Sequence, residues 1–514
     1  MLTRRRLIHL AFASGALGAS GAGAANSPAW ARDPFSLGVA SGYPLPTGIV
    51  LWTRLAPEPS AVGGGVPALP IAVDWEVAED ANFGAVVSRG TTWAAPQWGH
   101  SVHVEVGRLA PARWYYYRFH CGAATSPVGR TRTAPPADAA DAALRFAAVS
   151  CQHFEQGHYA AYRHIVADAP DLIVHLGDYI YESSWGDVQV RSHETAQEPT
   201  TLDDYRARYA HYRSDAALRD AHAACPWLVI WDDHEVDNDY ASDRSQDDDE
   251  RAWFLERRAR AYQAYYEHMP LPRAMVPFGP WMRIHTRLDF GRLARFHLLD
   301  DRQYRSYQPC PKPGRGGSNM IEACAARLDP AATMLGPRQE AWLAAQLTDS
   351  PATWNVLCQQ TLIAQADGKE GPGERWYSDI WDGYPAARTR LFDTLVTSGA
   401  RNPVSLGGDV HSFWVNDLKR DFDEPAAATL ATEFVTTALS SNPAPAGIVE
   451  TARAENAHVR YAVSGPRGYL RANLAAGTMQ VDLRALDDVT QQDSPCMTLK
   501  SFVVEDGRAG AAEA

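Results

Sequence analysis

Residues 171–182 read Asp-Leu-Ile-Val-His-Leu-Gly-Asp-Tyr-Ile-Tyr-Glu, an apolar run followed at once by a glycine and by polar and aromatic side chains. The apolar part, residues 171–176, predicts a buried strand. Three further apolar runs end in the same way: residues 144–150 lead into Cys151, residues 227–231 into Asp232, and residues 403–406 into Gly407. Ligand sites in open α/β sheets lie outside the carboxyl ends of the strands, so we expect these four endings to meet in one site.

Longer amphipathic segments between these runs predict helices. They cover residues 159–168, 202–224, 249–268, 337–348 and 386–398, and residues 354–357 predict one more buried strand. This alternation is typical of a layered α/β domain, which we place at residues 144–506.

The N-terminal part of the chain has a different pattern. Residues 34–135 contain short β runs separated by Gly and Pro, which predict a β-sandwich of the immunoglobulin or fibronectin type. The clearest strands are residues 48–53, 71–77, 101–106 and 113–119. Residues 133–138 are typical of a linker to the α/β domain.

The first 31 residues have the features of an export signal. Arg4, Arg5 and Arg6 precede a weakly apolar stretch that ends near Ala25, and Ala29-Trp30-Ala31 is a cleavage motif of small residues. The paired arginines indicate the twin-arginine export machinery as a partner. A general secretory signal, or a basic N-terminus on a cytosolic protein, are the alternatives. We expect a protein of the periplasm or one that is secreted.

Composition excludes several classes of protein. The 514 residues are 46% hydrophobic and 21% charged, which is ordinary for a packed globular chain with more than one folded unit. Beyond the signal, no apolar run approaches the ~20 residues of a membrane span, so we expect no span in the mature form. A net charge of −13 argues against nucleic acid as a partner.

The polar residues at the four strand endings are of types that bind metals. Asp178 and Tyr181 are three positions apart, so a short turn can direct both toward one ion; Asp409 and His411 are two apart and share a face in an extended segment. Carboxylate and amide oxygens suit hard cations, whereas thiolate, phenolate and imidazole suit a transition metal. A phenol ionises at neutral pH only beside a strongly acidic cation, which favours ferric iron over magnesium. We therefore expect two unlike metals.

Each of these residues also has a purely structural explanation. Cys151 could be a core thiol, Tyr181 a packing residue, Asp178 a helix N-cap and His411 a hydrogen-bonded buried histidine. Residues 232–235, Asp-Asp-His-Glu, are harder to explain, because two carboxylates and an imidazole in a predicted core need a cation or hydrogen bonds. The joint occurrence favours a metal centre.

Seven cysteines are present, an odd number. Export permits disulfides, and Cys310 and Cys324 flank a Gly/Pro-rich segment that a bridge between them would close. Free buried thiols are the alternative.

The motifs resemble those of the metallophosphoesterase superfamily. They are Gly-Asp-x-x-Tyr at residues 177–181, Asp-His-Glu at 233–235 and Gly-Asp-x-His at 408–411. The departures from the usual superfamily pattern, Cys151, Asp233 and Asp409, are similar to the alkaline phosphatase D (PhoD-like) family. Residues 299–305, 359–360 and 381–385 and the N-terminal β-domain resemble that family too. The resemblance covers nearly the whole mature chain and implies a layered αββα catalytic domain.

For this family the resemblance implies Fe³⁺ with Ca²⁺ and hydrolysis of phosphomonoesters and phosphodiesters outside the cytoplasm. Carried over to this chain, Cys151, Asp178, Tyr181 and His411 hold iron, and Asp178, Asn238 and Asp409 hold calcium, with Asp178 bridging. Asp233 is a further candidate ligand, and Asp239 competes with Asn238. A metal-bound hydroxide would be the nucleophile, with His234 as transition-state stabiliser or general acid.

Two alternatives to a general phosphatase stay open. One is a phospholipase D-like phosphodiesterase, because the motifs determine the centre and not the substrate. The other belongs to a different class: a cell-envelope protein that binds a polymer and uses its metals only for structure.

Overall fold

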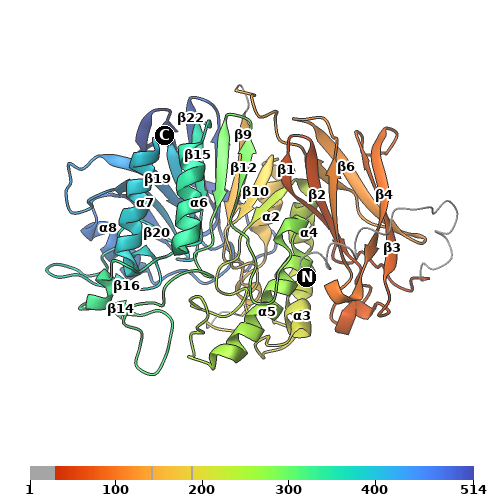
Figure 1. The fold of residues 1–514 in the computed structure, drawn as a ribbon, viewed down its shortest axis with the longest axis horizontal. Helices are drawn as coiled ribbons and strands as arrows, with labels where there is room; N and C mark the ends of the chain where they lie inside the picture. Colours follow the sequence, from red (N-terminus) through yellow and green to blue (C-terminus); the bar gives the residue numbers. More distant parts are fainter. Residues whose placement is uncertain (1–28, 141–142, 187–188) are drawn as a thin grey trace, which may run out of the picture.

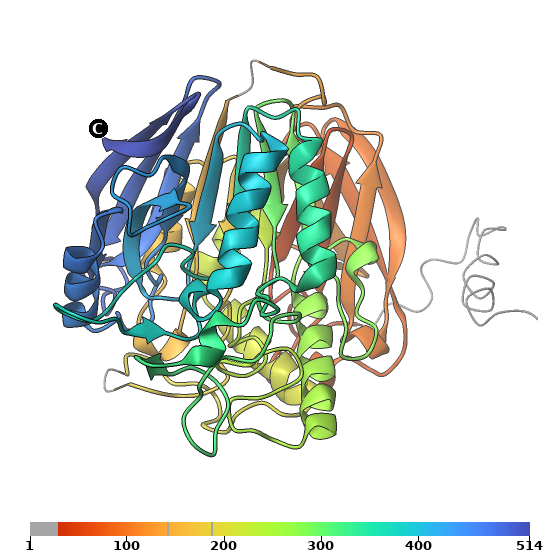
Figure 2. The ribbon, with the colours of Figure 1, turned by 60° about the vertical axis from the view of Figure 1, so that its left-hand side comes forward.

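The computed structural model describes residues 29–140, 143–186 and 189–514 (Figure 1). Two large β-sheets face each other at the centre of the molecule, and the side chains between them form the main apolar core. The Phe146 and Phe296 rings, one from each sheet, meet edge to face with centroids 5.5 Å apart. Helices cover the outer faces, which gives the αββα layering that the resemblance implied (Figure 2).

The first sheet has ten strands. In spatial order they are β24 (Arg508–Glu513), β23 (Cys496–Glu505), β22 (Thr478–Leu486), β21 (Arg467–Leu474), β9 (Leu144–Val149), β10 (Leu172–His175), β11 (Trp227–Val229), β1 (Val39–Leu45), β2 (Gly48–Arg54) and β5 (Ser101–Gly107). Strands β9, β10 and β11 run parallel. Their carboxyl ends therefore lie at one edge of the sheet, as three of the four apolar runs predict.

The second sheet has seven strands. In spatial order they are β12 (Thr286–Phe290), β13 (Ala294–Leu298), β15 (Trp354–Cys358), β17 (Pro403–Gly407), β19 (Thr429–Val435), β18 (Ser412–Lys419) and β20 (Val459–Ser464). Strands β13, β15, β17 and β19 are parallel neighbours. The expected strands at residues 354–357 and 403–406 are thus β15 and β17.

Seven α-helices and six short 3-10 helices are present in the described parts of the chain. The α-helices are α2 (Ala160–Ala167), α3 (Leu202–Arg213), α4 (Ala216–Ala224), α5 (Arg251–His268), α6 (Gly336–Thr348), α7 (Pro385–Ser398) and α8 (Ala446–Glu455). The 3-10 helices are η1 (Val62–Gly65), η2 (Pro96–Trp98), η3 (Phe154–Gln156), η4 (Arg273–Met275), η5 (Ala325–Leu328) and η6 (Trp381–Gly383). Helices α6 and α7 pack on the second sheet, and the side chains of α2 to α5 join the core beside the first. Each described helix is too short or too polar to cross a bilayer.

The prediction of a single helix at residues 202–224 was wrong. Two helices, α3 and α4, occupy this segment. The Asp215 side chain accepts a hydrogen bond from the backbone N–H of Leu218 and caps the start of α4, and Ser214 ends α3. An N-cap aspartate in the middle of an amphipathic run therefore interrupts the helix.

The N-terminal β-sandwich is present, and it shares a sheet with the catalytic part. Its outer sheet consists of β4 (Val86–Ala94), β3 (Ile71–Ala78), β6 (Trp114–Cys121), β7 (Ala124–Thr125) and β8 (Gly129–Arg132). Its other layer is β1, β2 and β5 of the ten-stranded sheet, where β1 pairs in parallel with β11. Gly42 makes this junction possible, because a Cβ there would lie 2.6 Å from the Pro270 carbonyl oxygen and 2.8 Å from that of Trp227.

Three smaller features complete the fold. Strands β14 (Met320–Ile321) and β16 (Trp376–Tyr377) form a two-stranded sheet. Cys310 and Cys324 form the expected disulfide, whereas Cys121, Cys151, Cys225 and Cys358 are free and buried. Residues 505–514 contain β24. Residues 1–28 of the predicted signal lie outside the described part of the chain.

Candidate metal centre

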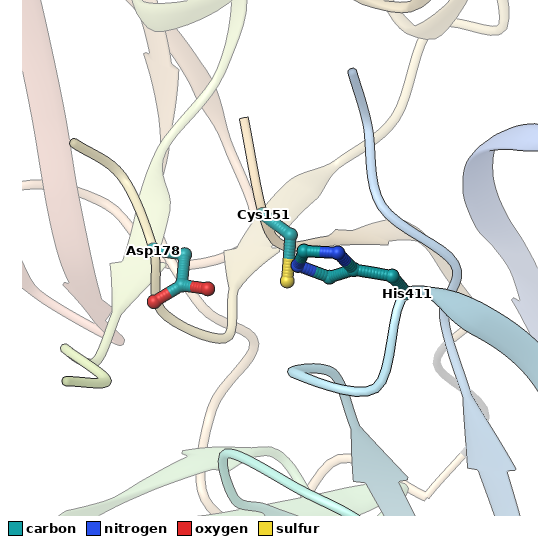
Figure 3. A group of neighbouring side chains, drawn as sticks. All are labelled: Cys151, Asp178 and His411. Carbon is teal, nitrogen blue, oxygen red and sulfur yellow. The ribbon is translucent and has the colours of Figure 1, made fainter. Parts of the chain in front are cut away.

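The four predicted strand endings converge between the carboxyl ends of the two sheets. Cys151 follows β9, Asp178 and Tyr181 follow β10, and Asp233, His234 and Asn238 follow β11. Asp409 and His411 follow β17 and approach from the second sheet. Figure 3 shows Cys151, Asp178 and His411 arriving from three separate segments and directed toward one another.

Cys151, Asp178, Tyr181 and His411 form one cluster, which we call the mixed-donor group. One potential ligand atom from each of Cys151, Asp178 and His411 lies within 4.8 Å of the other two. The Tyr181 hydroxyl donates to Asp178 Oδ2 at 2.9 Å and lies 3.1 Å from His411 Nε2. Thiol, phenol, imidazole and carboxylate thus meet at one point, which is the donor set of a transition-metal site.

Ser441 and Asn442 position this group, and the sequence analysis did not identify them. The Nδ1 atom of His411 lies 2.7 Å from the Asn442 carbonyl oxygen; a donated Nδ1–H there leaves Nε2 to face the group. The Ser441 hydroxyl lies 2.8 Å from the Cys151 carbonyl oxygen and 2.9 Å from the Tyr181 hydroxyl. Both residues follow β19, a parallel neighbour of β17, so the same strand-ending signal could have found them.

The mixed-donor group is largely buried, and a protein cation beside it is His234, which has a ligand atom within 4.8 Å of Asp178 and a ring centroid 4.0 Å from that of Tyr181. In the described chain, no arginine or lysine forms an ion pair with Asp178, and its Oδ1 atom is buried without a hydrogen-bond partner. Burial raises the pKa of the Asp178 carboxyl, the Cys151 thiol and the Tyr181 phenol well above their usual values; negative neighbours reinforce it, and at Asp178 the opposing effect of His234 only partly offsets it. A bound multivalent cation would stabilise all three anions, so the residues fit the implied metal.

Asp232, Asp233, Asp239, Asp379 and Asp409 form a second cluster, the carboxylate group. Arg302, which is fully buried, lies among them. Its Nη1 is 2.6 Å from Asp379 Oδ2, its Nη2 is 3.7 Å from Asp233 Oδ2 and 3.6 Å from Asp409 Oδ1, and its Nε bonds to Asp232. Arg305 adds one more contact, 3.1 Å from Asp379 Oδ1. Five carboxylates therefore face two guanidinium groups, and the excess negative charge suits a hard cation.

Asp233 links the clusters. Its carboxylate lies within 4.8 Å of ligand atoms from Asp178 and His234, from Asp232 and Asp409, and from Asp239 and Asp379. Burial acts to raise the pKa of Asp233, but Arg302 and His234 outweigh it and lower the value to about 2. Asp233 is thus an anion with access to both groups.

Asn238 and Asp239 point to different partners. The Asn238 Nδ2 donates to Gln246 Oε1 at 2.7 Å. This hydrogen bond does not use the side-chain oxygen of Asn238, which is the atom that would bind calcium. The Asp239 Oδ2 accepts from the backbone N–H of Ser318 at 2.9 Å and from its hydroxyl. Burial raises the pKa of Asp239 to about 7. Both residues line the same cavity.

The expected extended conformation at Asp409 and His411 was wrong. Both residues have positive φ, 65° and 46°, so their side chains do not share a face. Asp409 contacts Arg302 and accepts from the Thr361 hydroxyl at 2.6 Å, whereas His411 joins the mixed-donor group. Cys151 and Asp178 also have positive φ, both 57°. Such strain in non-glycine residues is typical of functional sites that the surrounding fold holds rigidly.

His234 is oriented by Glu182. Its Nδ1 lies 2.7 Å from Glu182 Oε2, and the other oxygen of Glu182 accepts from the backbone N–H of Asn238 at 3.1 Å. Burial acts to lower the pKa of His234, but Glu182, Asp178 and Asp233 outweigh it and raise the value. His234 is therefore favoured as a cation that can donate a proton. The sequence does not show this partner, because 52 positions separate the two residues.

A cavity of about 640 Å³ opens onto both groups. Its lining includes Asp178, Asp233, His234, Asn238, Asp409 and His411. Trp185 and Tyr377 also line the cavity, whereas Trp376 and Trp381 are buried. The predicted site residues are thus brought together where a small molecule has access to most of them.

Two facing sheets in αββα layers, with these donor groups at their carboxyl ends, define a metallophosphoesterase-type protein. The chain belongs to the PhoD-like phosphatase family: the family model matches residues 146–483, and the model of the PhoD-like phosphatase N-terminal domain matches residues 21–135.

Two individual relatives agree with this assignment. Alkaline phosphatase D of Bacillus subtilis (strain 168) is 42% identical over 492 residues, which cover 94% of this chain and 83% of the relative. A solved structure of PhoD is 41% identical, with a TM-score of 0.90 over 95% of this chain and 93% of that one. The similarity therefore includes both the sandwich and the catalytic part.

Proposed function

We propose that this phosphoric ester hydrolase cleaves phosphomonoesters and phosphodiesters at a mixed two-metal centre. Ferric iron is held by Cys151, Asp178, Tyr181 and His411, and calcium by Asp178, Asn238 and Asp409. Asp233, which reaches both clusters, is a further calcium ligand. The observation that carries the proposal is the buried mixed-donor group beside the carboxylate group, both open to one cavity. The Bacillus subtilis relative, named alkaline phosphatase D, supports the reaction class.

Bound metals would neutralise phosphate charge and lower the pKa of a water molecule that attacks phosphorus in line. The protein's own residues do the rest. His234, held by Glu182 and facing the cavity, donates a hydrogen bond to the phosphoryl group or a proton to the leaving oxygen. Arg302 has no exposed surface, so its role is to hold the carboxylates and not to touch substrate.

The proposal includes export. Its support is the arginine pair and apolar stretch within residues 1–28 and the small-residue motif at residues 29–31. A protein exported by the twin-arginine route arrives folded and can carry metals inserted in the cytoplasm. Trp30, inside the cleavage motif, donates its indole N–H to the Cys121 carbonyl oxygen at 3.0 Å. Cleavage after residue 31 would remove Trp30 and this contact, and the mass of the mature protein would show whether that happens.

The deciding experiment measures metals, colour and activity on one sample of exported, untagged protein. We expect about one iron per chain with calcium, a phenolate-to-iron band in the visible range, and hydrolysis of p-nitrophenyl phosphate and bis-(p-nitrophenyl) phosphate. Chelation should abolish activity while circular dichroism shows that the fold persists. An active protein that contains zinc, or no metal, would overturn the assignments of Cys151 and Tyr181.

His234→Ala separates catalysis from metal binding. We expect kcat to fall about 10²-fold or more with metal content nearly unchanged, since general acid catalysis contributes about 10² to 10⁴. His120→Ala is the matched control, because His120 lies on the sandwich and bonds to Thr125 and Glu76. If His234→Ala lost both metals, His234 would be a structural residue.

A further inference from the structure

The cavity that contains the candidate metal centre is also lined by many apolar side chains. Beyond the donor groups its wall consists mainly of hydrophobic side chains from five segments, at residues 320, 362–366, 377–380, 410–414 and 444–452. They include Leu362, Ile380, Trp414, Ile448, Val449 and Ala452. We call this part of the cavity the apolar arm. Because the donor residues and these apolar side chains line one cavity of about 640 Å³, a molecule with its phosphate at the metals can contact the arm as well.

Helix α8 provides one wall of the arm. Ile448, Val449 and Ala452 are one and four positions apart, so they share a face of the helix. Val449 and Ala452 are buried against the core beneath α6 and α7, whereas Ile448 is 44% exposed although it lines the cavity. Packing in the core therefore explains why Val449 and Ala452 are hydrophobic. It does not explain why the partly exposed residue at position 448 is an isoleucine.

Tyr377 also lines the cavity, but its phenol lies near Asp239, Asp379 and Asp409 of the carboxylate group, so the polar side chain among the apolar residues of the arm is that of Ser412. The Ser412 hydroxyl in its wall donates to the Val410 carbonyl oxygen at 2.8 Å and accepts from the Trp414 indole N–H at 2.8 Å. These polar atoms are thus satisfied by each other. A sugar or polyol in the arm would lose hydrogen bonds to water without regaining them from the wall, which costs binding free energy. An alkyl or aryl group loses none and gains by leaving water.

We propose that the apolar arm selects phosphate esters whose organic group is an apolar chain or ring, in preference to sugar, polyol or nucleoside esters. This inference rests on the proposed phosphoesterase activity, which it refines by naming the substrate class. The phosphate is bound by the donor groups, and the apolar group lies along α8 against Ile448. Specificity then arises from the burial of apolar surface and not from hydrogen bonding.

The test is a homologous series of p-nitrophenyl alkyl phosphodiesters, from methyl to octyl, used below their micelle-forming concentrations. Burial of a methylene is worth about a three- to fourfold change in an equilibrium or specificity constant. We therefore expect kcat/KM to rise about threefold per added methylene until the arm is filled. A p-nitrophenyl diester that carries glycerol in place of an alkyl group of similar size should react no faster than the methyl ester.

The variant Ile448→Asp tests the location of the chain. It should flatten the rise with chain length and leave the methyl ester nearly unaffected. Val396→Asp is the matched control: Val396 is 49% exposed on α7, does not line the cavity and should keep the wild-type rise.

A flat wild-type series, or a rise that survives Ile448→Asp unchanged, would overturn the apolar-arm proposal while leaving phosphoesterase activity intact. Failure of the wild-type protein to hydrolyse any member of the series, or p-nitrophenyl phosphate, would instead overturn the proposed function.

Discussion

The mixed-donor group and the carboxylate group lie side by side but differ in how their buried negative charge is balanced. The carboxylate group contains its own cation, Arg302, with Arg305 behind it. The mixed-donor group has no arginine or lysine partner in the described chain; His234 beside it only partly offsets its charge, and burial raises the pKa of each of its acids.

Arg302 keeps the pKa of Asp233 and Asp379 below the usual value. Burial still raises the pKa of Asp232, Asp239 and Asp409. The carboxylate group is therefore ionised in part in the metal-free protein, whereas the acids of the mixed-donor group are all favoured in their protonated forms without a metal.

Asp178→Asn should have the largest effect, because Asp178 is close to both groups. Ligand atoms of Cys151 and His411 lie within 4.8 Å of its carboxylate, and so do ligand atoms of Asp233 and His234. We expect kcat to fall about 10³-fold or more, since a bound metal is worth several kcal/mol in the transition state. Metal analysis should show loss of both ions.

The control for this change is Asp168→Asn. Asp168 pairs with Arg471 away from the candidate site, so its substitution should leave kcat within about twofold of wild type. Retention of both metals and of kcat within tenfold in Asp178→Asn would show that the two groups do not share this ligand.

The sequence predicted the parts of this comparison that depend on local order. An apolar run followed by polar residues marks a strand that ends at the site, and this signal located Cys151, Asp178, Asp233 and Asp409. It could not predict Arg302 as the counter-charge, because burial and ion pairing arise only when the second sheet packs on the first.

Backbone conformation was the other limit. Positive φ at Asp409 and His411 directs the two side chains to different clusters. Asp and His adopt positive φ more often than most residues, but residue type alone does not predict where they do so. The sharing of one sheet by the sandwich and the catalytic part was equally hidden, because β1 and β11 are far apart in the sequence. Strand endings are local, whereas charge balance and sheet continuity are properties of the assembled fold.

Arg302→Met tests whether the carboxylate group needs its internal cation. Removal of one partner from a buried ion pair costs about 3 to 5 kcal/mol, so we expect the free energy of unfolding of the metal-free protein to fall by about 3 kcal/mol. Cys151→Ala, in the group without an arginine or lysine partner, should cost about 1 kcal/mol. Denaturant titration after chelation measures both.

Calcium sharpens this test. If Arg302 balances carboxylate charge, added calcium should restore more stability to Arg302→Met than to Cys151→Ala. The reason is that calcium can bind the carboxylates that have lost their arginine partner. Equal losses in the two variants, with no selective rescue by calcium, would contradict the proposed difference between the groups.

Ser441→Ala should have the smallest effect and bears only on the mixed-donor group. The Ser441 hydroxyl lies 2.9 Å from the Tyr181 hydroxyl, where it can stabilise a phenolate. Loss of such a partner of a ligand typically lowers metal affinity 10- to 100-fold, and we expect about tenfold weaker iron with a shifted visible band. Ser440→Ala is the matched control, because the Ser440 hydroxyl donates to the His153 carbonyl oxygen instead. Since Ser441 contacts no carboxylate, calcium affinity should be unchanged; a parallel loss of calcium would mean that the two groups are one cooperative site.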